Sequence, residues 1–178
     1  MIGFFKRMFG RLAVDSFRGI ELPRKAAVGT RMLVVDDSPT ICAVLGRMLE
    51  RDGYAVQKAV DGESALEWAG EMQPQLIFLD IVLPGINGFA VLRALRHDPR
   101  TAHIPIVMIS GNPQATEQFY VQRFGADDFI KKPFGHAEVN ASIQQLVRAG
   151  RLAGRAVPSA VPALPAVVPA SHVSGAAA

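Results

Sequence analysis

The sequence predicts an α/β domain in which helices cover both faces of a five-stranded parallel sheet. From about Arg31 onward, short apolar runs alternate five times with stretches whose apolar residues recur at helical spacing. Strands that are apolar throughout and joined by helical crossovers are typical of a parallel sheet buried on both sides. In such sheets ligands bind beyond the carboxyl ends of the strands, so we expect a functional site at that edge.

The order of the elements can be assigned along the chain. The first strand is expected at residues 32–35, and a helix directly after Ser38-Pro39, where a capping hydroxyl precedes a proline at the first helical position. Gly53 follows that helix where a stop signal belongs. The further strands are expected at residues 54–60, 76–79, 104–109 and 128–130, and the further helices at 64–72, 88–96, 114–124 and 136–147.

Charge is segregated along the chain, although the net charge is only +3. Residues 1–31 carry seven Lys or Arg against two acids, and residues 32–147 carry nine against fourteen. The remaining residues carry three Arg and no acid. The positive net charge therefore says little about nucleic-acid binding by the acidic, folded part.

Composition divides the chain into three expected segments. A basic amphipathic arm is expected at 1–30, the folded domain at 31–148, and a disordered tail of mostly Ala, Pro and Val at 149–178. The prolines of the tail block a regular helix, and outside it no apolar run approaches the roughly 18 residues of a membrane-spanning helix.

Cysteine and histidine give no indication of a metal site. Cys42 is the single cysteine, which excludes an internal disulfide, and its apolar neighbours favour a buried position. This fits a cytoplasmic protein. The four histidines share no metal-ligand spacing and are expected at the surface: His97, His103, His136 and His172.

Polar residues follow the expected strands at one edge of the sheet. Asp36 and Asp37 follow the first strand, Asp80 the third, Ser110 the fourth and Lys132 the fifth. Three carboxylates without Cys or His suit a hard divalent cation such as Mg²⁺. A lysine and a hydroxyl beside them suit an incoming phosphoryl group. The set therefore indicates phosphoryl transfer onto a carboxylate, although Asp36-Asp37 alone would serve equally as a helix cap.

Four stretches of the sequence carry a family resemblance: MLVVDDSPT, LIFLDIVLPGINGF, IVMISGN and GADDFIKKPF. With these motifs, residues 31–148 resemble the receiver domains of two-component response regulators. They are especially similar to the stand-alone receivers of chemotaxis and twitching-motility systems. The resemblance implies a doubly wound, flavodoxin-like sheet of strand order 2-1-3-4-5 and a cis peptide bond before Pro133.

The resemblance also implies a role for each residue of the site. Asp80 is expected to be the phosphoacceptor and a Mg²⁺ ligand, Asp37 a direct ligand, and Asp36 an acid that holds the metal largely through water. The backbone carbonyl of Val82 is expected to complete the metal site, and Lys132 to contact the phosphate.

Two further residues are expected to couple phosphorylation to the surface, Ser110 as the switch hydroxyl and Phe129 as the switch aromatic. Ser110 replaces the commoner threonine and keeps the hydroxyl. Phe129 lacks the hydroxyl of a tyrosine, and as a sequence feature it would serve equally as a core aromatic. Asn87 stands where an acid is frequent, at a turn that asparagine tolerates well.

The expected function is that of a single-domain response regulator, a phosphoprotein of a phosphorelay. It would accept a phosphoryl group from a histidine kinase or phosphotransfer protein and act through a downstream effector protein. The expected output resembles that of chemotaxis or type IV pilus motility. No catalysis is expected beyond its own phosphorylation and dephosphorylation, and no direct DNA binding.

Three alternatives remain. An aspartate-dependent phosphatase would need a second carboxylate two residues after Asp80, where this chain has Val82. A flavin-binding protein would need a Ser/Thr/Gly-rich phosphate loop after the first strand, and DDSPT offers acids instead. A scaffold would use the arm as its active part, because residues 2–12 place six apolar side chains opposite three cationic ones. Such an arm suits weak docking to a membrane or a partner. It would fit equally a segment that packs on its own domain or is disordered, since Gly3 and Gly10 weaken a helix.

Overall fold

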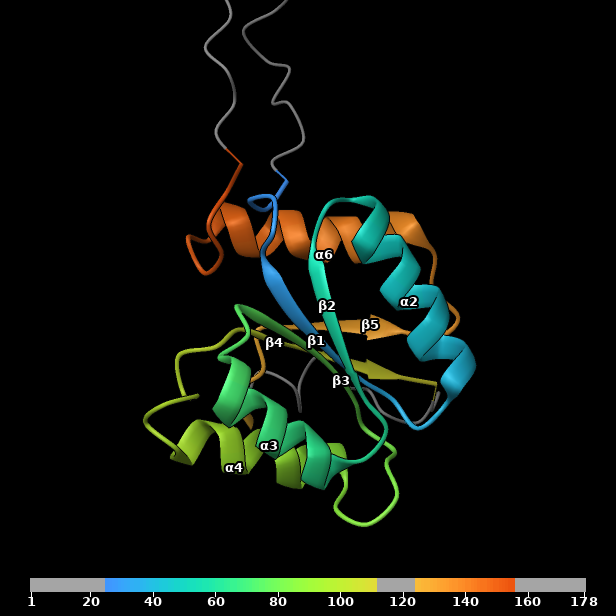
Figure 1. Cartoon of the computed structure of the whole chain (residues 1–178), viewed down its shortest axis with the longest axis vertical. Coiled ribbons are helices and arrows are strands. Elements are labelled where there is room, and N and C mark those ends of the chain that lie inside the picture. Colours follow the sequence, from blue (N-terminus) through green and yellow to red (C-terminus); the bar gives the residue numbers. More distant parts are fainter. Residues whose placement is uncertain (1–24, 112–123, 156–178) are drawn as a thin grey trace, which may run out of the picture.

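The computed structural model describes residues 25–111 and 124–155 of the 178-residue chain. Five parallel strands form one sheet in the order β2-β1-β3-β4-β5, which confirms the predicted topology (Figure 1). The strands are β1 (Arg31–Val35), β2 (Ala55–Ala59), β3 (Leu76–Asp80), β4 (Ile106–Ser110) and β5 (Asp128–Lys131). We call the edge at the carboxyl ends of the strands the rim, and the edge at their amino ends the foot.

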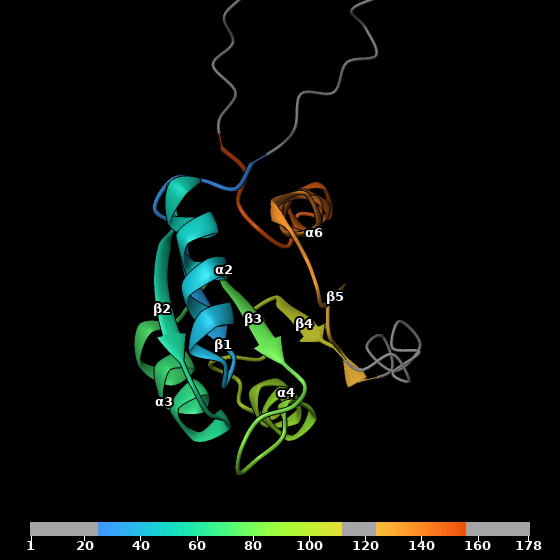
Figure 2. The same cartoon turned by 90° about the vertical axis from the view of Figure 1, so that its right-hand side faces the viewer.

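Helices cover both faces of the sheet (Figures 1 and 2). Helices α2 (Pro39–Arg51) and α6 (His136–Arg148) pack on one face, and α3 (Gly62–Met72) and α4 (Gly88–His97) on the other. Because side chains alternate along a strand, Met32 and Val34 of β1 enter the first core while Leu33 and Val35 enter the second. Every residue of β3 and β4 is buried, as the fully apolar runs predict.

Most element boundaries lie within two residues of their predicted positions. The strand expected from residue 104 begins at Ile106, because the amide of Ile104 donates to the carbonyl of Thr101 at 3.0 Å and closes a turn. The helix expected from residue 64 begins at Gly62, because Asp61 caps it through the amide of Ser64 at 2.7 Å. The helix expected at 114–124 lies outside the described residues apart from Phe124, as do most of the arm and of the tail.

The segments that flank the sheet and α6 hold each other at the foot. We call residues 25–30 and 149–155 the terminal clasp. Ala26 and Gly154 form an antiparallel bridge, and the amide of Arg155 donates to the carbonyl of Lys25 at 2.7 Å. Ala26 and Leu152 are buried. The packed body therefore extends on both sides of the expected range 31–148.

No helix in the described part of the chain is long and apolar enough to cross a membrane. Cys42 is buried in the core between the sheet and α2, as its apolar neighbours predict. His97, His103 and His136 are exposed, in agreement with their expected surface position, and His172 lies outside the described residues.

Candidate functional site

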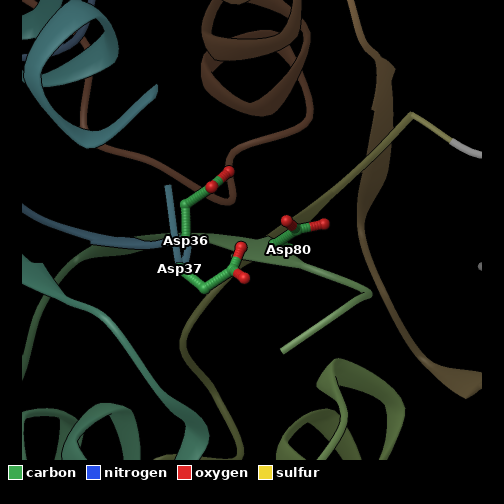
Figure 3. Close-up of side chains that lie close together, drawn as sticks. All are labelled: Asp36, Asp37 and Asp80. Atoms are coloured by element: carbon green, nitrogen blue, oxygen red, sulfur yellow. The ribbon is translucent and has the colours of Figure 1, made fainter. Parts of the chain in front are cut away.

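Three carboxylates meet at the rim because two neighbouring strands end there. Asp36 and Asp37 directly follow β1, and Asp80 is the last residue of β3, whose Leu79 is paired with Val35. Each of the three offers a carboxylate oxygen, and these oxygens all lie within 4.8 Å of one another (Figure 3). Asp36 and Asp80 are buried, whereas Asp37 is exposed.

Lys132 places an ammonium group between the two buried carboxylates. Its Nζ lies 2.6 Å from Oδ2 of Asp36 and 2.6 Å from Oδ2 of Asp80. The contact with Asp80 is a hydrogen bond, while the contact with Asp36 is an ion pair without hydrogen-bond alignment. The backbone holds the lysine in place, because its amide donates to the carbonyl of Ser110 at 2.7 Å. The peptide bond between Lys132 and Pro133 is cis, as expected.

Backbone amides satisfy one oxygen of each buried carboxylate. The amide of Ser38 donates to Oδ1 of Asp36 at 3.0 Å, and the amide of Val82 donates to Oδ1 of Asp80 at 3.3 Å. Oδ2 of Asp36 is buried and has no hydrogen-bond partner within the described residues. A buried carboxylate oxygen with unused acceptor capacity, in an all-oxygen cluster, fits a Mg²⁺ site.

The electrostatics of the cluster follow from burial and from the shared lysine. Burial raises the pKa of Asp36, and the nearby charge of Asp80 adds to this, although Lys132 and the Ser38 amide oppose it. Burial alone would lower the pKa of Lys132, but its close contacts with the carboxylates of Asp36 and Asp80, and their negative charge, outweigh burial and raise that pKa. Three carboxylates against one ammonium leave the rim short of positive charge, which favours binding of a cation.

The remaining predicted residues lie around this cluster. Ser110 is the buried last residue of β4. Phe129 in β5 is half-buried against the core beneath α3 and α4, and its register partner is Met108. Val82 follows Asp80 by two residues, with an exposed side chain. The structure thus gathers at the rim all the predicted residues except Phe129, which lies two residues before the end of β5.

Two features of the site were not predicted. A Cβ added at Gly88 would collide with the carbonyl oxygen of Asp80, so glycine lets α4 begin against the end of β3. The thiol of Cys42 donates to the carbonyl of Asp36 at 3.2 Å and steadies the turn that carries both acids. The Asn87-Gly88 pair predicted a turn, but no sequence signal reports the close approach or the thiol contact. Asn87 caps α4 through the amide of Ala90 at 2.9 Å.

Comparison with known proteins agrees with this geometry. The response regulator receiver domain family matches residues 32–144. The chain is 42% identical over 118 residues to the DNA-binding dual master transcriptional regulator RpaA of Synechocystis, which covers 66% of this chain and 49% of RpaA. It is 40% identical over 103 residues to protein PilH of Pseudomonas aeruginosa, covering 58% of this chain and 85% of PilH. The chain thus spans about half of RpaA but most of PilH.

Solved structures show the same fold. A putative response regulator from Chloroflexus aurantiacus superposes with a TM-score of 0.63 at 29% identity, covering 67% of this chain and 98% of that one. The chemotaxis response regulator CheY4 of Vibrio cholerae superposes with a TM-score of 0.62 at 27% sequence identity. The match covers 66% of this chain and 98% of CheY4. The receiver domain of the sensor histidine kinase PA1611 of Pseudomonas aeruginosa superposes with a TM-score of 0.62 at 27% sequence identity, covering 68% of this chain and 99% of that one. That structure holds a magnesium ion in its active-site cleft. The chain therefore belongs to the family of response regulator receiver domains of two-component systems.

Proposed function

We propose that this chain is a single-domain response regulator that accepts a phosphoryl group on Asp80. Receiver domains are signalling domains rather than conventional enzymes, and they interact with histidine kinases or phosphotransfer proteins and with effectors. The observation that carries the proposal is the setting of Asp80, a carboxylate that ends β3 beside two acids and 2.6 Å from the ammonium of Lys132. A buried carboxylate nucleophile with a lysine ammonium group in contact suits phosphoryl transfer.

In the proposed reaction, an Oδ atom of Asp80 attacks the phosphorus of a phosphohistidine. The new O–P bond forms as the P–N bond breaks, and the imidazole leaves with the electron pair and takes up a proton. Lys132, which pairs with Asp80 in the structure, would turn to the phosphoryl oxygens and neutralise their charge. Hydrolysis of the acyl phosphate by water would return the carboxylate.

Receiver domains bind Mg²⁺ at an acidic site, and an acidic cluster is present in this chain. We assign Asp37 and Asp80 as direct ligands, Asp36 as a ligand largely through water, and the backbone carbonyl of Val82 as a further ligand. Bound there, Mg²⁺ would supply positive charge to the phosphoryl oxygens during transfer. The unused acceptor on Asp36 supports this donor set.

We assign Ser110 and Phe129 as the residues that pass phosphorylation to the face of β5, α6 and the helix expected at 114–124, most of which lies outside the described residues. A hydroxyl drawn toward the phosphate would leave space into which the ring could move. A groove of about 420 Å³ runs along β5 and α6 and supports a partner contact there. Its lining includes Phe129, Lys131, Glu138, Ser142 and Gln145.

Amide NMR before and after phosphorylation tests this coupling. The amide chemical-shift changes caused by phosphorylation should extend from the rim to Phe129 and the groove. The Ser110→Ala substitution should reduce the chemical-shift changes near Phe129. Shifts confined to the rim in the wild type would contradict the coupling.

For the output, we propose an effector contact similar to that of chemotaxis or type IV pilus motility regulators, without direct DNA binding. Similarity to the chemotaxis regulator CheY4 and coverage of most of PilH support this. The similarity to RpaA, which is named as DNA-binding, extends over about half of that protein.

We further propose a cytoplasmic location with weak attachment to an anionic membrane or partner through residues 2–12. In this proposal the chain has three parts: the arm, the receiver domain with its terminal clasp, and the tail. The test is cosedimentation with anionic vesicles and pull-down from lysate, for the full chain and for a chain without residues 1–13. Identical behaviour in both assays would exclude a docking role for the arm.

Phosphorylation itself is tested by intact mass after incubation with acetyl phosphate and Mg²⁺. The wild type should gain the mass of one phosphoryl group, and Asp80→Asn should gain none. Asp128→Asn, which removes a carboxylate from the first residue of β5 away from the rim, serves as the matched control and should gain mass as the wild type does. An equal gain in Asp80→Asn and wild type would refute the assignment of Asp80.

A further inference from the structure

The foot of the sheet gathers basic side chains. Helices that follow parallel strands run back to the foot, and three of the described helices carry basic residues in their last turn. Among the residues that the structure describes, the foot and the terminal clasp together hold eight cations: Lys25, Arg31, Arg51, Arg96, Arg100, Arg148, Arg151 and Arg155. Six acids of the described residues lie beside them: Glu50, Asp52, Glu71, Asp98, Asp127 and Asp128. The foot is therefore positive, in contrast to the rim.

Ion pairs occupy the acids that are central to the foot. Asp52 pairs with Lys25 at 2.8 Å, and Asp127 contacts both Arg96 at 2.9 Å and Arg151 at 2.7 Å. Since two guanidinium groups share the one carboxylate of Asp127, a positive charge remains there. The guanidinium group of Arg31 is also held in place, because it donates to the carbonyls of Met72 and Gln73 at 3.1 and 2.9 Å. The excess positive charge therefore comes from side chains with defined positions.

A pocket of about 250 Å³ lies in the middle of this basic surface. Arg31 comes from the start of β1, His103 from the loop before β4, and Arg151 from the clasp. Gln73 and Gln75 add amide groups, and no carboxylate is among the residues that line the pocket. Guanidinium, imidazole and amide groups together offer hydrogen-bond donors to the oxygens of a phosphate group.

The chain enters and leaves the described domain at this same surface. Lys25 and Arg155, the outermost described residues, are joined by a backbone hydrogen bond of 2.7 Å (Figures 1 and 2). The preceding residues 1–24 carry five Lys or Arg against two acids in the sequence. The basic arm is thus joined to the domain beside the basic foot, and far from the acidic rim.

We propose that the foot docks on an anionic lipid bilayer, with Arg31 and Arg151 facing lipid phosphates and the rim facing away. This rests on the proposed attachment through the arm and adds a second contact, made by the folded domain. A bilayer is the favoured occupant because the cations are spread over several elements of one edge and adjoin a segment whose apolar side chains suit a lipid interface. In this orientation the phosphoacceptor site remains open to a soluble or membrane-bound kinase.

The test uses the full chain and vesicles of zwitterionic lipid with or without phosphatidylserine. Arg31→Gln/Arg151→Gln removes two charges from the foot, and Arg47→Gln/Arg93→Gln removes two from the middle of α2 and α4 as the matched control. Each basic residue near an anionic surface changes partitioning by about fivefold. We expect the foot variant to bind anionic vesicles roughly 5- to 25-fold more weakly than wild type, and the control to stay within about twofold.

Arg31→Lys/Arg151→Lys keeps the charge and should bind as the wild type does, whereas a structural role of the guanidinium groups would leave this variant impaired. Equal binding by the foot variant and its control would overturn the proposal, as would equal binding of wild type to vesicles without phosphatidylserine. If deletion of residues 1–13 abolishes binding while the foot variant binds like wild type, the arm proposal stands and the foot proposal fails. Mass gain with acetyl phosphate, retained in every variant, confirms that the domain is folded.

Discussion

At the rim three carboxylates face one ammonium group, whereas at the foot the two central carboxylates each meet two basic side chains. Lys132 is shared by Asp36 and Asp80, while Asp127 contacts Arg96 and Arg151 and also accepts from the amide of Ile106 at 2.8 Å. Asp52 contacts Lys25 and His136. The central carboxylates of the foot are neutralised by fixed basic side chains, which support the fold and leave the foot with an excess of positive charge. The rim is short of positive charge and is completed by ligands. Four predictions test this contrast, from the largest expected effect to the smallest.

The first prediction concerns whether the terminal clasp belongs to the stable fold. Leu152→Ala removes a side chain that is only 5% exposed, so it should lower the free energy of unfolding by about 2–5 kcal/mol. Val28→Ala, in the same clasp but 67% exposed, should be nearly neutral. Urea denaturation compares the two. If both variants unfold alike, the clasp is not part of the cooperative core. Phosphorylation of the folded Leu152→Ala protein should be unchanged.

The second prediction concerns the charge deficit at the rim. Asp37→Ala should weaken Mg²⁺ binding by at least about tenfold, because it removes a direct ligand, and Asp36→Ala should weaken it less. Asp98→Ala, which removes an acid near the foot, should bind Mg²⁺ as the wild type does. Calorimetry measures the three affinities. An unchanged affinity in Asp37→Ala would mean that this residue does not hold the metal.

The third prediction concerns backbone contact at the rim. In Gly88→Ala, the new methyl group meets the carbonyl of Asp80, so the start of α4 must shift and stability should fall by about 1–3 kcal/mol. In Gly70→Ala, the atom nearest to the new methyl group lies 4.0 Å away. Because this position is inside a helix, the free energy of unfolding should rise by about 0.5–1 kcal/mol. Phosphorylation by acetyl phosphate should slow only in Gly88→Ala. An unchanged stability of Gly88→Ala would show that α4 can shift away from the end of β3 at little cost in free energy.

The fourth prediction concerns pH and the foot. Burial would raise the pKa of Asp52, but hydrogen bonds and attraction from Lys25 and His136 outweigh it and lower that pKa. A carboxyl with a lowered folded pKa stabilises the protein above its unfolded pKa and loses this contribution as the pH falls through the folded value. Asp52→Asn should therefore cost about 1 kcal/mol at neutral pH, since both partners are partly exposed.

This difference between wild type and Asp52→Asn should shrink once the pH falls below 3.8, the ordinary pKa of an aspartate side chain. Urea denaturation along a pH series measures it. A difference that is constant from neutral to acidic pH would show that the ionised carboxylate is not what stabilises the foot.

Sequence reasoning recovered the sheet and the positions of the site residues because both depend on local signals. Hydrophobic periodicity and apolar runs place the strands, and the carboxyl ends of parallel strands lie at one edge, so the sequence places Asp36, Asp80 and Lys132 at the same edge. The order of the strands, which brings these residues together, was implied by the family resemblance. The exact extent of the elements was less accessible. The start of β4 depends on a turn closed by Thr101, and the start of α3 on the cap by Asp61, which compete with the apolar pattern.

By itself, the sequence determined that this protein is a doubly wound α/β domain with an acidic cluster and a lysine at one edge of its sheet. The tertiary structure alone decided which charges share a partner: Lys132 bridges Asp36 and Asp80, and Asp127 joins Arg96 to Arg151 across 55 positions of the chain. It also decided that residues 25–30 and 149–155 belong to the packed body. Such contacts join segments distant in sequence, and their formation depends on packing geometry that neither periodicity nor local propensity encodes.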